Sequence, residues 1–331
     1  MRQALVTGGL GFIGSHLVRA LVAQGRRVRV LDSAPDSEAS WLADFPEADL
    51  RERIEVIHGD VRDEVTCRKA CWGVDVVFHL AAMVSVPMSV DDPLLADAIN
   101  TTGTLNLLVA ARDCHVRRVV FSSSAAVYGD TSVVPVHEDV PTRPTSPYGI
   151  QKLTGEHYAR TFTALYGLET VCLRYFNVYG PGQKPGSAYA AAVPALMTRL
   201  LSGQAPTIFG DGEQTRDFCF VQDVVQANLL AAQTTRPEAL GAVFNIAGGT
   251  RTSLNQLYTH MADILATDLP PHYAPERAGD IRHSGADISR AQALLGYAPR
   301  YNLCRGIEEA APYYLEIFGS PQIRRVLRPA A

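Results

Sequence analysis

The sequence has few of the features that mark metal sites, disulfide scaffolds and nucleic-acid binding. Its six cysteines form no C-x-x-C pair and no zinc-type spacing, so we expect reduced thiols and no metal ion. No block of like charge occurs and the net charge is −4, which argues against a nucleic-acid partner. No apolar stretch approaches the ~20 residues that cross a bilayer, and the first residues show no signal-peptide pattern. We therefore expect a cytoplasmic protein without membrane contact.

What the sequence does contain is a regular alternation of apolar runs and longer helical patterns. The runs at 3–8, 27–32, 54–60, 75–82 and 117–124 predict strands, and the patterns at 11–25 and 94–114 predict helices. A further helix is predicted at 148–167, followed by a strand at 170–178. Near-continuous apolar strands separated by helices indicate an α/β fold with a doubly wound parallel sheet, covered by helices on both faces.

The pattern changes after residue 178. Glycine and proline cluster in "YGPGQKPGSAY", a helix is predicted at 189–203, and the later elements are short and mixed. The run at 242–248 predicts a buried strand that returns to the main sheet. We therefore expect a first domain at 1–178, joined by 217–248, and a smaller, mixed α/β substrate lobe at 179–216 and 249–331.

A glycine-rich loop joins the first strand to the first helix. Gly8, Gly11 and Gly14 form a G-x-x-G-x-x-G pattern there, and Asp32 ends the second strand 18 residues after Gly14. Such glycines let the backbone approach a pyrophosphate, which then faces the positive end of the helix. A carboxylate at Asp32 would bind ribose hydroxyls and repel a 2′-phosphate, and no Arg or Lys directly follows it. The pattern predicts a Rossmann-type site for NAD.

Two more strand ends extend this site. Asp60, in "GDV", is placed within reach of an adenine, and "HLAA" ends the fourth strand with small residues that admit a cofactor. The residues of the loop and the strand ends that we expect to contact NAD are Gly8, Gly11, Phe12, Ile13, Gly14, Asp32, Asp60, Val61, Leu80, Ala81 and Ala82.

Ser124, Tyr148 and Lys152 form the candidate catalytic group. Tyr148 and Lys152 stand four residues apart at a helix start and share one face. Ser124 ends the fifth predicted strand, where a parallel sheet forms its ligand crevice. Tyrosine titrates near ~10 in water, and a neighbouring ammonium and a cationic nicotinamide ring would both lower that pKa. We therefore expect Tyr148 to act as a base with a lowered pKa, and Ser124 to hydrogen-bond the reacting oxygen.

Together these motifs resemble the extended short-chain dehydrogenase/reductase superfamily, within its nucleotide-sugar epimerase and dehydratase group. The resemblance runs from Gly8 to about Phe318, through "TGGLGFIGSHL", "FSSSAAVYGD", "PYGIQKLTGE", "LRYFNVYGPGQ", "IFGDGEQTRDF" and "RAGDIRHSGADISRA". It implies a tightly held NAD that oxidises a sugar alcohol and then returns the hydride. It also implies that Tyr148 and Lys152 both contact NAD. Tyr148 would move the proton, and Lys152 would hold the nicotinamide ribose.

Residues beside Ser124 narrow the reaction. The related 4,6-dehydratases carry Asp-Glu after this serine or threonine, whereas Ala125 and Ala126 stand here and transfer no proton. The NADPH-dependent epimerase-reductases have a cysteine in this neighbourhood, which "SSSAAVYG" lacks, and the UDP-glucuronate decarboxylases differ from "GDIRHSGAD". The resemblance thus favours 4-epimerisation of a UDP-sugar. A UDP-glucuronate 4-epimerase and a non-enzymatic NAD-sensing protein of the same fold remain alternatives.

The same resemblance assigns substrate contacts to the later motifs, besides Ser124. Arg216 and Arg282 match arginines that bind the diphosphate, for which a planar guanidinium is suited. Asn177 matches a further diphosphate contact, and Ser85 a position beside the sugar or the phosphates. Asp280 would contact either the nucleoside ribose or Arg282.

Ser284 is the position that we expect to influence which sugar the enzyme accepts. Relatives restricted to plain hexoses carry a tyrosine there, beside carbon 2 of the sugar, whereas a serine leaves room for an N-acetyl group. Forcing several extra atoms into a packed site costs ~1–3 kcal/mol, enough for tenfold discrimination. The predicted substrates are UDP-GlcNAc and UDP-GalNAc, with UDP-glucose and UDP-galactose as further ones. The helices at 94–114 and 148–167 also resemble those through which relatives pair, so a homodimer is expected.

Overall fold

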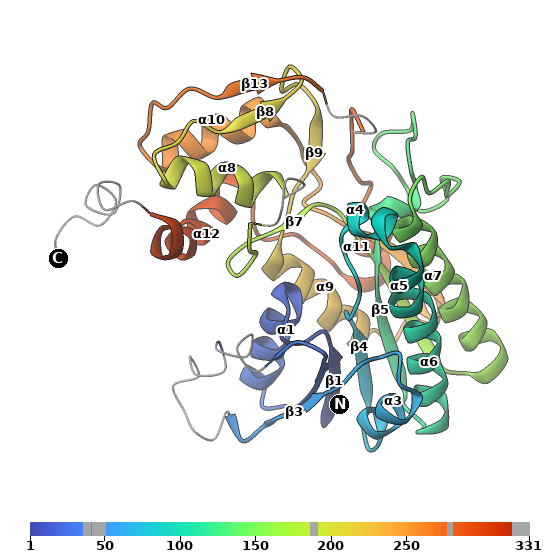
Figure 1. Ribbon diagram of the computed structural model, residues 1–331. Coiled ribbons are helices and arrows are strands. Elements are labelled where there is room, and N and C mark those ends of the chain that lie inside the picture. The colour runs from blue at the N-terminus through green and yellow to red at the C-terminus, as the bar shows by residue number, and fades with distance from the viewer. Residues whose placement is uncertain (36–40, 42–50, 186–190, 277–280, 320–331) are drawn as a thin grey trace.

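The computed structural model describes residues 1–35, 41, 51–185, 191–276 and 281–319, and its centre is a seven-stranded sheet (Figure 1). The strands are β1 (Gln3–Thr7), β2 (Arg27–Asp32), β3 (Ile54–His58), β4 (Val76–His79), β5 (Arg118–Ser124), β6 (Glu169–Tyr175) and β11 (Ala242–Ile246). Their order is β11-β6-β5-β4-β1-β2-β3, and every neighbouring pair is parallel. The winding reverses between β1 and β4, which places the ligand crevice at the carboxyl ends of these strands. The predicted doubly wound parallel sheet is confirmed.

Helices cover both faces of this sheet. On one face α1 (Phe12–Ala23) packs with α9 (Val221–Gln233), and on the other lie α3 (Glu64–Cys71), α6 (Gly103–Asp113) and α7 (Pro147–Tyr166) (Figure 1). Side chains alternate along a strand, so Ala4 and Val6 of β1 join the core under α1 while Leu5 joins the core under α3 and α6. The central strands β1 and β4 are therefore buried almost throughout, whereas β3, at the edge of the sheet, is partly exposed.

Two predicted elements differ from the structure at their ends or in their middle. The strand expected at 170–178 is β6, which ends at Tyr175, because Asn177 adopts a left-handed φ of 31° before the short β7 (Val178–Tyr179). The helix expected at 94–114 consists of α5 (Pro93–Asp97), a π-helical turn η2 (Ala98–Thr102) and α6. A side chain from that turn reaches the loop after β4, as described below.

The helical run Pro93–Asp113 contradicts the expectation that no apolar stretch of this chain is long enough to cross a bilayer. It has 21 residues and a mean hydropathy of 1.2, so by length and composition it is long and apolar enough to cross a membrane. In this fold it packs against α3 and α7. Its buried Asn100 and Thr104 hydrogen-bond to Gln151 and His79. Buried polar groups that are paired with neighbouring elements belong to a packed core helix.

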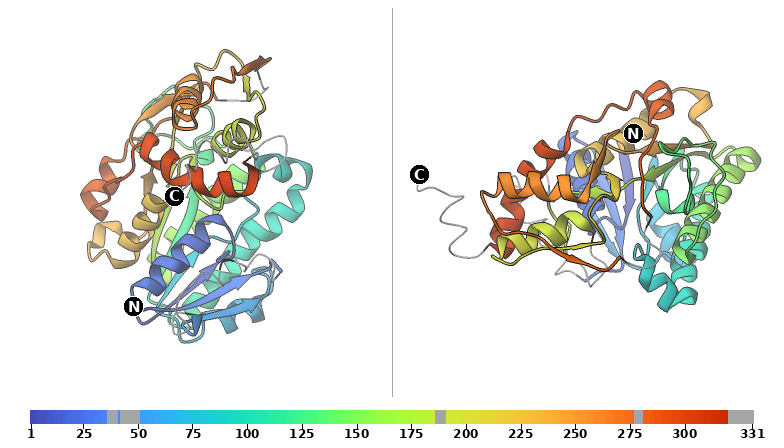
Figure 2. Two further views of the ribbon diagram at one scale, coloured as in Figure 1. Left: turned by 90° about the vertical axis from the view of Figure 1, so that its left-hand side faces the viewer. Right: turned by 90° about the horizontal axis from the view of Figure 1, so that it is seen from above.

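A smaller group of elements lies at one end of the molecule, beyond the carboxyl ends of the strands (Figures 1 and 2). It comprises α8 (Ala192–Leu201), α10 (Leu254–Ile264), α12 (Leu303–Phe318) and the strand pairs β8 (Thr207–Phe209) with β13 (His272–Ala274) and β9 (Thr215–Asp217) with β12 (Arg251–Ser253). The three helices share one apolar core, which includes Met197, Leu257 and Ile307. β11 lies back in the main sheet beside β6. The domain boundaries themselves remain a prediction.

The remaining short elements connect these layers. They are α4 (Val86–Asp91), η3 (Ala125–Val127), β10 (Cys219–Phe220), η4 (Pro237–Ala239) and α11 (Ser289–Leu295).

Candidate active site

The glycine loop after β1 has the shape of a phosphate cradle. Gly8 has a φ of 68°, and a Cβ on it would lie 2.8 Å from the backbone nitrogen of Ala81, at the end of β4. A Cβ on Gly14 would lie 2.1 Å from the carbonyl oxygen of Gly8. Helix α1 starts at Phe12 with no side-chain cap and no acidic residue in its first turn, which leaves its N-terminal N–H groups for an anion. The loop, with Gly11 and Ile13, therefore fits a dinucleotide pyrophosphate.

Two carboxylates predicted to face the cofactor lie at the ends of β2 and β3. Asp32 accepts hydrogen bonds from the backbone N–H groups of Leu10 and Ala34, at 2.8 and 2.9 Å, so it ties the glycine loop to its own strand. Asp60 pairs with Arg62 at 2.7 Å, and this guanidinium lowers the pKa of the Asp60 carboxyl. Val61 next to it is buried.

Polar side chains inside the core fix the loop after β4. The Thr7 hydroxyl accepts from the Ala81 N–H at 3.1 Å and bonds Nδ1 of the buried His79 at 2.8 Å. Burial lowers the pKa of His79 to about 3, so its imidazole is neutral. From the π-helical turn, Asn100 bonds both the N–H and the carbonyl of Met83, at 2.8 and 3.1 Å. The segment Leu80, Ala81 and Ala82, which we predict to face the cofactor, is thus held from two sides.

The structure brings the three predicted catalytic residues together. Ser146 caps α7 by accepting from the Gly149 N–H, so Tyr148 lies in the first turn, beside the end of β5. Its phenol hydrogen-bonds the hydroxyl of Ser124, the last residue of β5. Lys152, one turn later, is buried and donates from Nζ to the Ser122 carbonyl at 2.8 Å.

The pKa values of this group differ from the prediction. Burial raises the pKa of Tyr148 to about 12, and the Ser124 hydrogen bond only partly opposes this. Nζ of Lys152 lies 5.9 Å from the centre of the Tyr148 ring and donates to a carbonyl instead. Burial also lowers the pKa of Lys152 to about 7. The side chains alone therefore do not lower the Tyr148 pKa, because desolvation outweighs the hydrogen bond with Ser124; the predicted lowering also invoked a cationic nicotinamide ring.

Three residues that we predict to bind the substrate, Asn177, Arg216 and Arg282, lie on strand β9 or beside it. Arg216 lies within it, and the Asn177 amide donates to the Asp217 carbonyl at 3.0 Å. The segment after the undescribed residues 277–280 runs beside it, with the Thr215 N–H donating to the Arg282 carbonyl and the Ser284 N–H to the Thr215 carbonyl, both at 3.0 Å. The predicted contact Asp280 lies outside the described residues.

The same segment also contacts the loop that follows β5. The Val136 N–H donates to the Gly285 carbonyl at 2.8 Å, so residues 282–287 bridge the lobe and the sheet. A Cβ on Gly285 would lie 2.6 Å from the side chain of Arg251, which explains a glycine beside Ser284. Ser284 itself is half-buried between these elements. Ser85, by contrast, uses its hydroxyl to cap α4, accepting from the Met88 N–H at 3.2 Å.

Several residues of the site carried no clear signal in the sequence. Asp211 holds Arg282 through two hydrogen bonds of 2.9 and 2.7 Å, and this guanidinium lowers the pKa of Asp211 to about 2. The buried Asp217 carboxylate accepts from the N–H groups of Gly249 and Ala286, at 3.1 and 3.2 Å, and so joins three segments. Both are acidic residues in a loop or a short strand. The sequence contains many such residues, so nothing singled out these two.

Comparison with known proteins identifies the family. A model of the NAD dependent epimerase/dehydratase family matches residues 4–247. The chain belongs to this family. It is therefore an enzyme that uses NAD, as the glycine loop and Asp32 predicted, and the extended short-chain dehydrogenase/reductase resemblance is confirmed.

The family members most similar to this enzyme include proteins that act on different sugars. The UDP-glucose 4-epimerase of Mycolicibacterium smegmatis is 39% identical over 314 residues, which cover 94% of this chain and 98% of that protein. The structure of UDP-N-acetylglucosamine 4-epimerase from Methanobrevibacter ruminantium, in complex with UDP-N-acetylmuramic acid, has a TM-score of 0.88 and 36% identity, covering 96% and 99% of the two chains. That of UDP-glucuronic acid 4-epimerase from Bacillus cereus, in complex with UDP-glucuronic acid and NAD, has a TM-score of 0.86 and 31% identity, covering 96% and 100%.

Proposed function

We propose that this enzyme interconverts the 4-epimers of a UDP-sugar, and that UDP-GlcNAc and UDP-GalNAc are its principal substrates. The observation that carries the reaction is the group of Ser124, Tyr148 and Lys152 at the carboxyl end of β5, beside the glycine loop. Ala125 and Ala126 follow directly in η3 and offer no acid or base for eliminating water. The relatives described above are 4-epimerases, which supports the same reaction here.

In this proposal the chain's residues bind, orient and move a proton. Bound NAD takes up and returns the hydride at carbon 4. Ser124 hydrogen-bonds the reacting oxygen, and Tyr148, as phenolate, accepts its proton and later gives it back. Lys152 holds the nicotinamide ribose. Because burial raises the pKa of Tyr148, the positive charge of bound NAD would be needed to favour the phenolate. The reaction needs no net oxidant, because the same proton and hydride return to the sugar.

In this proposal the enzyme holds the substrate by its diphosphate while the oxidised sugar rotates. Arg216, Asn177 and Arg282 all lie on or against β9, and arginine presents a planar fork to phosphate oxygens. With the nucleotide held there, the oxidised sugar is free to present its other face. Asp280 belongs to the same proposal, by its place two residues before Arg282.

The test is direct. Purified enzyme is incubated separately with UDP-GlcNAc, UDP-glucose and UDP-glucuronate, and the products are identified by NMR. We expect UDP-GalNAc to form fastest. Faster conversion of UDP-glucuronate would favour the uronate epimerase instead, and an enzyme that binds NAD but converts none of the three would favour a sensor.

The substitution Ser284→Tyr tests the choice of sugar. A tyrosine in this half-buried position would occupy space beside the sugar, so kcat/KM for UDP-GlcNAc should fall about tenfold or more while that for UDP-glucose changes little. Ser284→Ala, which adds no bulk, is the matched control and should resemble the wild type on both sugars. Equal losses on both sugars in the tyrosine variant would contradict the assignment.

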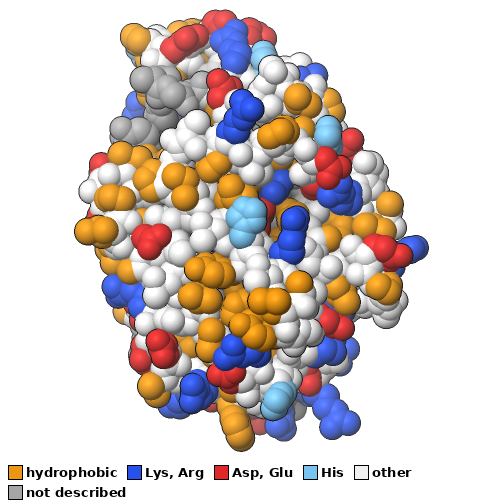
Figure 3. Space-filling view, turned by 90° about the vertical axis from the view of Figure 1, so that its right-hand side faces the viewer, with side chains coloured by type: hydrophobic (Ala, Val, Ile, Leu, Met, Phe, Trp, Pro, Cys, Tyr) orange, Lys and Arg blue, Asp and Glu red, His pale blue; other side chains and the backbone are white. Residues whose placement is uncertain are grey.

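A cytoplasmic homodimer is also part of this proposal. Exposed apolar side chains gather on the face that carries α4 to α7, among them Met88, Leu94, Ile150, Leu165 and Tyr166 (Figure 3). Apolar patches of this kind are common at subunit interfaces. The face includes both helices that the resemblance assigns to pairing.

A further inference from the structure

Each of the three consecutive serines that end β5 contacts a different residue of α7. The Ser122 carbonyl accepts from Lys152, the Ser123 hydroxyl donates to Glu156, and Ser124 bonds Tyr148. The residues on α7 follow one another at intervals of one turn, so they share a face. Two of these contacts involve the catalytic group. The contact between Ser123 and Glu156 has no part in the proposed reaction.

Glu156 is held more firmly than a surface carboxylate. Its two oxygens accept from Nε and Nη2 of Arg174, at 2.8 and 2.6 Å, and the side chains are only 4% and 5% exposed. Arg174 is on β6, directly opposite Ser123 of β5 in the sheet register. Glu156 thus connects α7 to two neighbouring strands. Planar, two-point pairing of this kind fixes an orientation as well as a distance.

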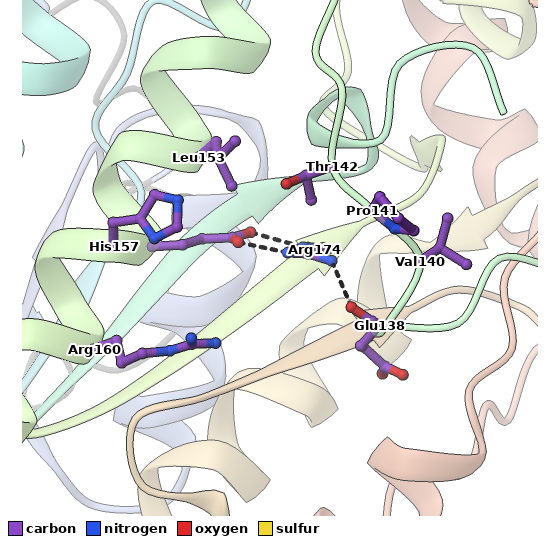
Figure 4. A pocket seen from close by; sticks show the side chains of 9 residues that line it. Glu138, Val140, Pro141, Thr142, Leu153, His157, Arg160 and Arg174 are labelled. Atoms are coloured by element: carbon purple, nitrogen blue, oxygen red, sulfur yellow. Dashed lines mark hydrogen bonds and ion pairs between the residues drawn. The ribbon is translucent and has the colours of Figure 1, made fainter.

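A surface pocket lies beside this pair, and both side chains of the pair line it. Its volume is about 230 Å³, and Thr142, Leu153 and Arg160 are among its lining residues (Figure 4). Figure 4 shows Arg174 between the carboxylate of α7 and Glu138. This part of α7 also packs against the sheet through a buried apolar cluster that includes Ala159, Phe121 of β5 and Cys172 of β6.

We propose that Glu156 is a positioning residue, which Arg174 and Ser123 hold so that Lys152 and Tyr148 keep their places against Ser122 and Ser124. This rests on the proposed epimerase reaction. The ion pair adds a directional polar link to the apolar packing of α7, and a shift of α7 along the sheet would separate the catalytic side chains. Misplacement of reacting groups by about 1 Å is enough to cost about 100-fold in rate.

Glu156 also acts on Lys152 through its charge. The carboxylate raises the pKa of Lys152, in opposition to the larger effect of burial. The other ionisable groups facing this region include Tyr148 and Cys172, whose pKa values burial raises, and His79, which burial keeps neutral. Arg174 and Arg160 add positive charge on the side of β6 and the pocket. Removal of the carboxylate should therefore let Lys152 lose its proton at lower pH.

The test uses the NAD-loaded enzyme and the double variant Glu156→Gln/Arg174→Gln, which removes the pair without leaving a buried charge unpaired. We expect kcat to fall about 10- to 100-fold with KM little changed. The NAD dissociation constant should rise, and its increase at alkaline pH should begin at lower pH than in the wild type. Arg160→Gln is the matched control at the rim of the same pocket, because none of the described residues pairs with Arg160, and it should behave as wild type.

The outcomes separate the two proposals. If the double variant keeps the wild-type kcat and NAD profile, whatever its melting temperature, Glu156 does not position the site. If it does not fold, Ser123→Ala decides, because it keeps the ion pair and cuts only the link to β5. A lowered kcat then supports the proposal, and an unchanged kcat overturns it. If the wild type epimerises no UDP-sugar, the proposed function fails, and the NAD profiles still decide the role of Glu156.

Discussion

Replacing Tyr148 by phenylalanine should lower kcat for UDP-sugar epimerisation by about 10²- to 10⁴-fold, the usual contribution of a general acid–base group. Phenylalanine keeps the buried ring and its packing in α7 but has no proton to exchange with the sugar. Since the ring remains, NAD should stay bound. The measurement is turnover by NMR, together with the NAD content of the purified variant.

Tyr297→Phe is the matched control for this change. Tyr297 is fully buried and donates to the Ala247 carbonyl at 2.8 Å, so its variant also loses one buried phenol hydrogen bond. That loss should lower stability by about 1 kcal/mol and leave turnover nearly unchanged. A Tyr148→Phe enzyme that keeps a substantial share of wild-type turnover would show that another group moves the proton.

Lys152→Met should have opposite effects on activity and on stability. Nζ of Lys152 lies in the catalytic group, and a charge-assisted hydrogen bond contributes about 1.5–3 kcal/mol, so NAD affinity should fall about 10- to 100-fold and turnover at least as much. Methionine keeps a similar volume without the ammonium. Calorimetric NAD binding and epimerase turnover measure these losses.

The gain in stability follows from the lowered pKa of Lys152, about 7 in the folded protein. Between this value and the ordinary value near ~10.4, the unfolded chain binds more protons than the folded one, so wild-type stability from this group rises with pH. Below about 7 the folded state bears the full cost of the buried ammonium. NAD-free Lys152→Met should therefore exceed the wild type in melting temperature by more at neutral than at strongly alkaline pH. Lys69→Met, at an exposed position of α3, is the control and should show no such pH dependence.

Much of the fold followed from the sequence because its signals are local. Short apolar runs such as 3–8 and 75–82 became the buried parallel strands β1 and β4, and the periodic segment 148–167 became α7. The parallel direction of the strands follows from the same alternation, because a helix between two strands returns the chain to the edge where the next parallel strand begins. The strand at 170–178 was predicted too long, since no local pattern reveals the left-handed φ of Asn177.

Some residues of the candidate site could likewise be predicted from local sequence signals, and others could not. Gly8, Gly14, Tyr148 and Lys152 were recognisable because their spacing along the chain, within one loop or one helix turn, already fixes their relation in space. Ser124 needed one further assumption, that parallel strands end at a common edge. The glycine loop and Asp32 predicted NAD, and these residues together with the later motifs predicted the family; the comparisons bear out both.

Only the tertiary structure showed how the remaining charges are arranged. Arg282 with Asp211, and Glu156 with Arg174, are partners from different elements, and nothing in the intervening sequence selects one carboxylate over another. The pKa of Tyr148 likewise depends on how much of the core closes over it, which raised the value where spacing alone suggested that it should fall. Sequence by itself determined the sheet and the cofactor and predicted a catalytic group, because these rest on local periodicity and on short motifs. Tertiary packing decided which charges pair and which are desolvated, because both depend on atoms brought together from distant parts of the chain.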